Sequence, residues 1–363
     1  MLSHLYNPNT DNPSFDDLIK TGIVLDKKGT INVVKPEIVP PSIIHISQVA
    51  SGRGLYRGWI SNLQKCIRRG QPREACKSAY ECGIMNGPFL SNVINRVCKV
   101  IVSEDIGCCN LFLPIKVANF LDELNTLKNP TEKLDKLFEI IVDMCHSNKT
   151  RIADLSLHLQ RKISCFKVIK YLNFETAFME CKKFLDVKEL LGTVHALEYC
   201  MDHGREIMKN EKITNEMLLV SKSQHYMKTK IYKVWDMLCN IEMCKRQEIL
   251  NANVALFKIW VSNKGSETIL NLIHAACNII HADQLDFQLR NLHKEEKYTC
   301  EMLENCNDVW IQSAAYDKHV SRWKHPERNS TAFFYLYGSK IDSTLPSMYK
   351  IENEMFNAMM NFV

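Results

Sequence analysis

A cluster of cationic side chains lies where one predicted helix ends and the next one begins. Its members are Lys65, Arg68, Arg69 and Arg73. The stretch WISNLQKCIRRGQPREACKSAYECG, residues 59–83, predicts an amphipathic helix, a turn at Gly70 and a second helix that starts at Pro72. These cations could bind phosphate together with the amides at the start of the second helix. Alternatively, they only offset the dipole of the first helix, which is worth about 0.3–1 kcal/mol for each charge. The sequence therefore predicts a candidate DNA contact and leaves a purely structural role open.

A second cationic stretch, YDKHVSRWKHPERN at residues 316–329, mixes basic and aromatic side chains. The candidate nucleic-acid contacts in it are Arg322, Trp323, Lys324 and Arg328. Aromatic rings stack on bases and neighbouring cations attract phosphates, so this composition is typical of a nucleic-acid-binding surface. Trp, Tyr and Arg are also enriched in protein interfaces, so a protein partner is the alternative.

Sequence motifs of the common enzyme classes are absent. The chain contains no GxxxxGK[ST] phosphate loop, no GxSxG turn, no HExxH helix and no GxGxxG turn. A structural zinc site needs two converging sets of ligands, and the cysteine and histidine pairs of this chain have no matching second half. These pairs are Cys108 with Cys109, Cys200 with His203, and Cys239 with Cys244. We therefore predict a non-enzymatic protein with no metal and no other cofactor.

The composition is that of a soluble, helix-rich protein. Of 363 residues, 46% are hydrophobic and 24% are charged. Only 13 glycines and 11 prolines are present, which favours helices over a turn-rich β fold. The formal net charge of +5 is mild, so any DNA contact should be a local patch.

Fifteen cysteines mostly occupy apolar positions of predicted helices, and the polar N-terminal residues contain no signal peptide. Buried thiols of this kind indicate a reducing compartment, so we expect the nucleus or cytoplasm, including that of a virus-infected host cell, or a virion. No apolar run has the length of a membrane span, so we expect no membrane association.

Three segments are expected along the chain. Within residues 1–50, the stretch TGIVLDKKGTINVV alternates apolar and polar residues around a turn at Asp26–Gly29, and several prolines follow it, which predicts an N-terminal arm with a β-hairpin. Residues 51–130 should form a helical domain, and residues 131–363 a helical body that ends in an amphipathic helix. The predicted fold is therefore mostly α, a multi-helix bundle with a short β arm.

The helical body is predicted from apolar residues that recur with helical spacing, as in the stripe from Leu134 to Cys145. Short connections with capping residues, such as Asn173, separate the helices. Further helices are expected at about 174–184, 187–203, 226–245, 248–262, 266–281, 284–297 and 299–315.

Three motifs, taken in their order along the chain, resemble the C-terminal helical region of the MgsA/RarA (Werner-helicase-interacting) class of AAA+ recombination factors, which are relatives of clamp loaders. The motifs are WISNLQKCIRRGQPREACKSAYECG, NRVCKVIVSEDIG and YDKHVSRWKHPERNSTAFFYLYGSKID. The matching positions are Ser61, Leu63, Lys65, Ile67 and Arg68, then Arg96, Glu104, Asp105, Ile106 and Gly107, then Asp317, His319, Phe334, Gly338 and Lys340. The segment HPERNST stands where the family has a glycine-rich sequence.

The resemblance implies a clamp-loader-like collar or oligomerisation domain that belongs to DNA replication and repair machinery. It implies no ATPase activity, because the nucleotide-binding domain of the family is absent from this chain. Arg96, Glu104 and Asp105 would then be structural. Apart from the resemblance, Glu104 and Asp105 could form a salt bridge to an arginine of the first predicted helical hairpin. Lys65 and Arg68 would be either structural or DNA-facing.

Together, these observations predict a non-enzymatic accessory or scaffold subunit in DNA metabolism, of a large DNA virus or of a cell. Its expected partners are DNA, proteins of a replication or transcription assembly, and further copies of the same chain. The alternative is a structural protein, or a subunit of a transcription complex, that makes only protein contacts.

Overall fold

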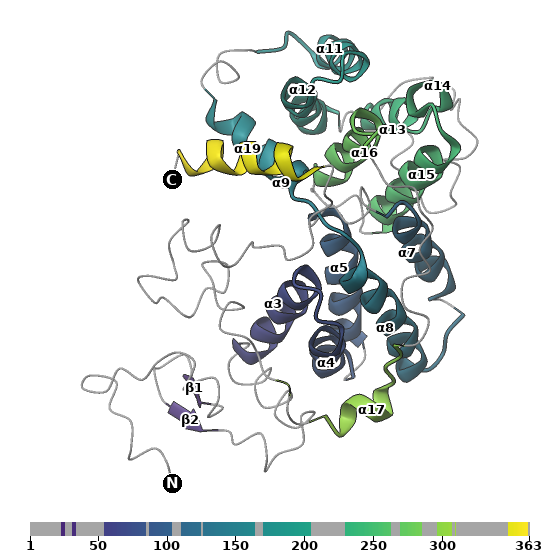
Figure 1. Ribbon diagram of the computed structural model, residues 1–363. Coiled ribbons are helices and arrows are strands. Elements are labelled where there is room, and N and C mark those ends of the chain that lie inside the picture. The colour runs from purple at the N-terminus through teal and green to yellow at the C-terminus, as the bar shows by residue number, and fades with distance from the viewer. Residues whose placement is uncertain are drawn as a thin grey trace. The chain divides into compact units, whose positions relative to one another are not determined.

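The computed structural model describes two short strands and most of the helical part of the chain. The described residues are 23–25, 31–33, 54–84, 87–103, 110–124, 126–163, 170–204, 229–262, 269–284, 296–306, 309 and 348–361. Within them the fold is mostly helical (Figure 1), which confirms the predicted all-α character. Strands β1 (Ile23–Leu25) and β2 (Ile31–Val33) pair in antiparallel register. The rest of the predicted arm at residues 1–50 lies outside the described residues, so the arm stays a prediction.

Contacts divide the chain into two compact units, and each unit combines segments that are far apart in the sequence. Unit 1 contains α3 (Gly54–Arg68), α4 (Pro72–Gly83), α8 (Pro130–His146) and α17 (Cys300–Glu304). Unit 2 contains α7 (Phe112–Glu123), α9 (Ile152–Lys162), α11 (Phe174–Asp186), α12 (Leu190–His203), α13 (Ile231–Leu238), α14 (Ile241–Cys244), α15 (Gln247–Ser262), α16 (Leu270–Ile280) and α19 (Tyr349–Met360). The division falls within α5 (Gly87–Ser103).

The predicted domain boundaries at residues 50 and 130 do not coincide with this division. The sequence assigns α8 to a separate helical body, whereas α8 packs on α3 and α4. Cys76 Sγ lies 3.9 Å from the carbonyl oxygen of Phe138, across the α4–α8 contact. At Gly83, an added Cβ would come within 2.7 Å of Leu134 Cδ2, so the missing side chain lets the two helices approach. Helical periodicity shows which face of a helix is buried, but it does not show which helix covers that face.

The turn between α3 and α4 has the form that the sequence predicts. Gly70 adopts φ = 65°, a conformation that glycine takes without the strain a side chain would add. Its amide donates to the carbonyl of Ile67 at 3.1 Å, and the amide of Gln71 donates to that of Cys66 at 2.9 Å. This pair of bonds is a Schellman motif, which satisfies the last carbonyls of α3 and turns the chain back into α4.

A buried charged group joins α17 to α4. Lys77 and Glu81, one helical turn apart on α4, are almost completely buried and lie 2.8 Å apart. The Lys77 ammonium also donates to the carbonyl oxygen of Leu303 at 2.7 Å and lies over the ring of Tyr80. Burial raises the pKa of the Glu81 carboxyl, while Lys77 lowers it. The pair therefore holds a distant segment against the first helical hairpin.

Helix α16 forms the centre of unit 2. Its residues from Asn271 to Ile280 are all buried, and it packs against α9, α12 and α15. Its buried Asn278 has a partner inside the core, since Asn278 donates to Asn253 of α15 at 2.9 Å, and Asn253 donates to the carbonyl of Leu238 at 2.7 Å. A helix that is buried on all sides needs such internal hydrogen bonds.

The segment predicted as one helix at 226–245 contains two helices in its described part, α13 and α14. The side chain of Asn240 interrupts it by accepting a hydrogen bond from the amide of Glu242 at 2.8 Å, which starts α14. The predicted cap at Asn173 is confirmed, because its side chain accepts from the amide of Thr176 at 2.9 Å. The segment predicted at 284–297 lies almost entirely outside the described residues.

All twelve cysteines that the structure describes are buried and free, as the pattern of apolar helical positions predicts. Among the described helices, none has both the length and the apolar character needed to cross a membrane.

Candidate functional site

The α3–α4 corner, defined as residues 65–74, contains four predicted contact cations that differ in burial. Lys65 is 4% exposed and Arg68 is 2% exposed. Lys65 donates to Ser61 Oγ, one turn earlier on α3, at 3.0 Å. Both side chains lie in the core because the last turns of α3 are buried nearly all round, with Asn62 and Ile67 also inside. Neither cation can reach a phosphate without leaving the core, so their position favours the structural role.

Arg69 and Arg73 lie at the surface of the same corner. Arg69 is half-buried after the last residue of α3, and Arg73 is exposed in the first turn of α4. The positive end of the α4 dipole adds to their charge. These two arginines are therefore the residues of the predicted cluster that are placed for contact with an anionic partner.

A carboxylate lies close to this corner. An added Cβ on Gly70 would lie 3.2 Å from the carbonyl oxygen of Cys145, which places the end of α8 behind the turn. The next residue, His146, contacts Glu296 with Nε2 and Oε2 2.6 Å apart. Tyr298 donates to the other oxygen of Glu296 at 2.6 Å, and burial together with this bond raises the pKa of Tyr298. The local charge is therefore mixed rather than purely positive.

Thiols behind the corner are held in the protonated form by burial. Burial raises the pKa of Cys66 and Cys76, and the neighbouring Cys145 raises both further. A thiol that stays protonated is a poor nucleophile and a poor metal ligand. Among the described residues, no group of three or more His, Cys, Asp or Glu side chains could hold a metal ion.

Other predicted site residues are only partly described. Arg96 Nη1 donates to Gln64 Oε1 of α3 at 3.4 Å, a contact that links α5 to the first hairpin. The other two residues predicted to be structural, Glu104 and Asp105, lie outside the described residues, so their salt bridge stays a prediction. The predicted contacts Arg322, Trp323, Lys324 and Arg328 also lie outside them, so their roles stay predictions.

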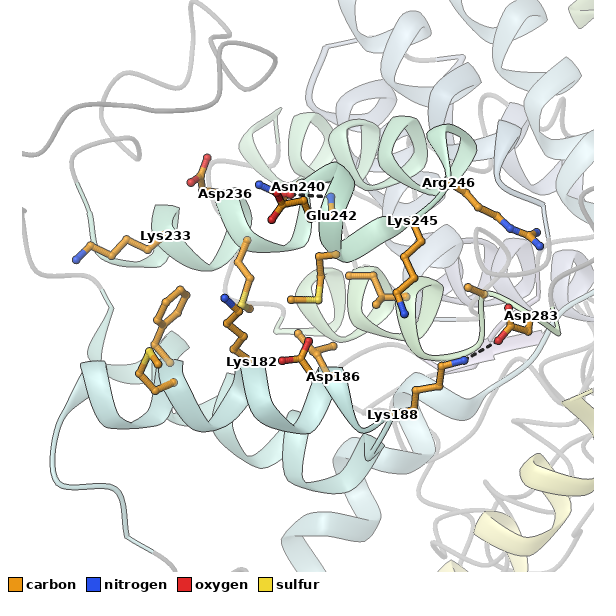
Figure 2. A pocket seen from close by; sticks show the side chains of 17 residues that line it. Lys182, Asp186, Lys188, Lys233, Asp236, Asn240, Glu242, Lys245, Arg246 and Asp283 are labelled. Atoms are coloured by element: carbon orange, nitrogen blue, oxygen red, sulfur yellow. Dashed lines mark hydrogen bonds and ion pairs between the residues drawn. The ribbon is translucent and has the colours of Figure 1, made fainter.

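Unit 2 contains a pocket that the sequence does not indicate. It has a volume of about 510 Å³ and is lined by α11, α13, the α14 segment and the turn after α16. Its apolar surface includes Phe178, Met237, Met243 and Ile279. Charged side chains surround this surface (Figure 2).

One end of the pocket carries three cations and Asp283, and the carboxylate of Asp186 lies between this end and the middle of the pocket. Figure 2 shows Lys188, Lys245, Arg246 and Asp283 together at this end. Lys188 Nζ lies 2.6 Å from Asp283 Oδ2. The hydrogen bond and charge of Lys188 lower the pKa of Asp283, and the charges of Arg246 and Lys245 lower it further. Three positive charges thus act on one negative charge.

Two of these cations occupy unusual backbone conformations. Lys188 (φ = 58°) and Lys245 (φ = 60°) each follow a helix end in the left-handed region, where glycine is the preferred residue. After α11, the amide of Lys188 donates to Leu185 and that of Glu189 to Phe184, so Lys188 holds the usual glycine position of a Schellman motif. Neither helix is followed by the glycine that commonly ends a helix. The missing glycine could indicate this arrangement in the sequence, but only once the helix ends are known.

No family model matches the chain, and no curated protein or solved structure matches it. The resemblance to the clamp-loader-like collar therefore rests on the three sequence motifs alone and continues as a proposal.

Proposed function

We propose that the protein is a non-enzymatic accessory subunit that works by binding, within an assembly of DNA replication, recombination or repair. In this proposal it acts as a helical scaffold that recruits partner proteins and contacts DNA locally. The assembly belongs to a cell or to a large DNA virus, in the nucleus or the cytoplasm.

The observation that carries this proposal is the position of Arg69 and Arg73. A Schellman turn separates Arg69, at the end of α3, from Arg73, in the first turn of α4, where the helix dipole also favours an anion. The motif resemblance to a collar of DNA repair factors gives the anion its proposed identity as DNA phosphate. Lys65 and Arg68 then keep the corner in shape from within the core.

The double variant Arg69→Glu/Arg73→Glu tests the DNA contact. Loss of two phosphate contacts should lower affinity for a double-stranded oligonucleotide about tenfold or more, and should reduce the slope of log K against log[salt] by about 2. Fluorescence anisotropy at several salt concentrations measures both quantities. The variant Arg68→Glu would not test the DNA contact, because a buried carboxylate there would destabilise the fold.

A matched control is available at the other end of the same unit. Lys128 is exposed and lies just before α8, and Lys133 is half-buried in the first turn of α8. The variant Lys128→Glu/Lys133→Glu changes the net charge equally and should leave the affinity nearly unchanged. Equal losses for both double variants would reject a specific role for the corner.

A second candidate is the scaffold that contacts only proteins. The burial of Lys65 and Arg68 favours it, and so does the Glu296 carboxylate beside the corner, which weakens attraction for phosphate. This alternative predicts only weak DNA binding at physiological salt, with the same salt slope in the wild type and the arginine variant.

A further inference from the structure

The pocket of unit 2 combines an adaptable apolar surface with a localised excess of positive charge. Methionine side chains rotate freely and fit differently shaped partners, so Met237 and Met243 suit the binding of another protein's side chain. Lys188, Lys245 and Arg246 lie at one end, whereas Lys233 and Asp236 lie at the other (Figure 2). A ligand that matches this arrangement has an apolar body and a negatively charged end.

Exposed apolar side chains lie in and next to the pocket. Met179, which lines the pocket, is 52% exposed, and its neighbours Val187 and Ile241 are 71% and 47% exposed. A small molecule held inside the pocket would leave Val187 and Ile241 in water, whereas a protein segment would cover them. Exposed apolar residues around a hollow with a polar rim are typical of protein-binding surfaces.

The two left-handed lysines carry the argument for an acidic ligand. A side chain in this backbone region carries a conformational cost that glycine does not. The chain accepts this cost twice, and both positions bring an ammonium group to the same end of the same pocket. Asp283 shows that a carboxylate can bind there, since it forms an ion pair with Lys188 at 2.6 Å.

We propose that this pocket binds a short segment of a partner protein in which a bulky apolar side chain stands next to acidic residues. The apolar side chain fills the methionine-lined hollow, and the carboxylate lies beside Lys245 and Arg246. Asp283 competes with that carboxylate for the same cations. This site belongs to unit 2 and needs no DNA contact, so its test is independent of the function proposed for the corner.

The test uses the full chain and a random peptide library displayed on phage. Selected peptides should share a large apolar residue within a few positions of Asp or Glu. A synthetic copy of one selected peptide then serves as the probe in fluorescence polarisation. Lys245→Glu should weaken its binding about tenfold, because attraction becomes repulsion at the rim. The exposed Lys128→Glu, with the same charge change, should leave binding unaltered.

A second variant predicts a gain. Asp283→Asn removes the competing carboxylate and should strengthen binding of the selected peptide about fivefold, an effect that non-specific apolar binding would not give. The proposal is overturned if no apolar-acidic sequence is enriched, if Lys245→Glu and Lys128→Glu bind alike, or if inorganic phosphate displaces the peptide as well as an excess of unlabelled peptide does. The last result would identify a site for small anions.

Discussion

Burial places chemically similar residues in different environments. Arg68 and Arg69 are neighbours in the sequence, yet Arg68 lies in the core and Arg69 lies at the surface. The cluster of cations could be predicted from the sequence, but its division could not. That division depends on which helices cover α3, and the residues of α8 that do so lie more than fifty positions further along the chain. The same limit applies to Lys188 and Lys245. In a sequence, a lysine usually indicates only a solvent-exposed position, and nothing there shows that these two meet in one pocket.

His281 gives a prediction for stability against pH. Burial lowers its pKa to about 4, and the charge of Lys188 acts in the same direction, although Gln284 acts against it. The unfolded chain, with a His pKa of about 6.5, therefore binds more protons than the folded chain between pH 6.5 and pH 4. Stability should fall as the pH drops through this window, by about 2 kcal/mol from pH 7 to pH 5.

The measurement is urea unfolding of the wild type and of His281→Gln at pH 7 and pH 5. Glutamine does not titrate in this range, so the variant should lose about 2 kcal/mol less stability than the wild type over the same interval. An equal loss in both proteins would show that His281 does not control this part of the pH dependence.

At the scale of helices, most segments could be predicted, because spacing and capping residues act locally. Asn173 starts α11, and Gly70 with Pro72 marks the α3–α4 turn, each through a contact within a few residues. The break at Asn240 cannot be predicted, since one asparagine within an apolar pattern does not distinguish a cap from a surface position. Partner choice between helices is not a local property, so the packing of α8 on α3 and α4 cannot be predicted from periodicity either.

The contact between α4 and α17 gives a prediction at this scale. Lys77→Met should leave the Glu81 carboxylate buried without its cation and release the carbonyl of Leu303, at a cost of about 3–5 kcal/mol. The double variant Lys77→Met/Glu81→Leu removes both charges and should be less destabilised than the single variant. Urea denaturation measures the free energy of unfolding of the double variant and of the single variants Lys77→Met and Glu81→Leu. A double variant destabilised by the sum of the two single changes would contradict this account.

For the whole molecule, the motif resemblance predicts a homo-oligomer, as expected of a collar domain. Size-exclusion chromatography with light scattering should then give a mass that is a multiple of 42.0 kDa. The experiment needs low micromolar protein and a second run at tenfold dilution, because a weak assembly dissociates on dilution. A mass of 42.0 kDa at both concentrations would argue against the collar-like role, while leaving the helical fold unaffected.

The bond between Lys77 and Leu303 also has a consequence for synthesis, since 226 residues separate the two partners. A ribosome that adds about 5–20 residues per second needs roughly 10–45 s to cover that distance. During this delay the nascent α3–α4 hairpin carries the Lys77–Glu81 pair, and Lys77 lacks its final acceptor. We expect early folding of this hairpin to depend on molecular chaperones, and a slow stretch of translation before residue 300 to prolong that dependence.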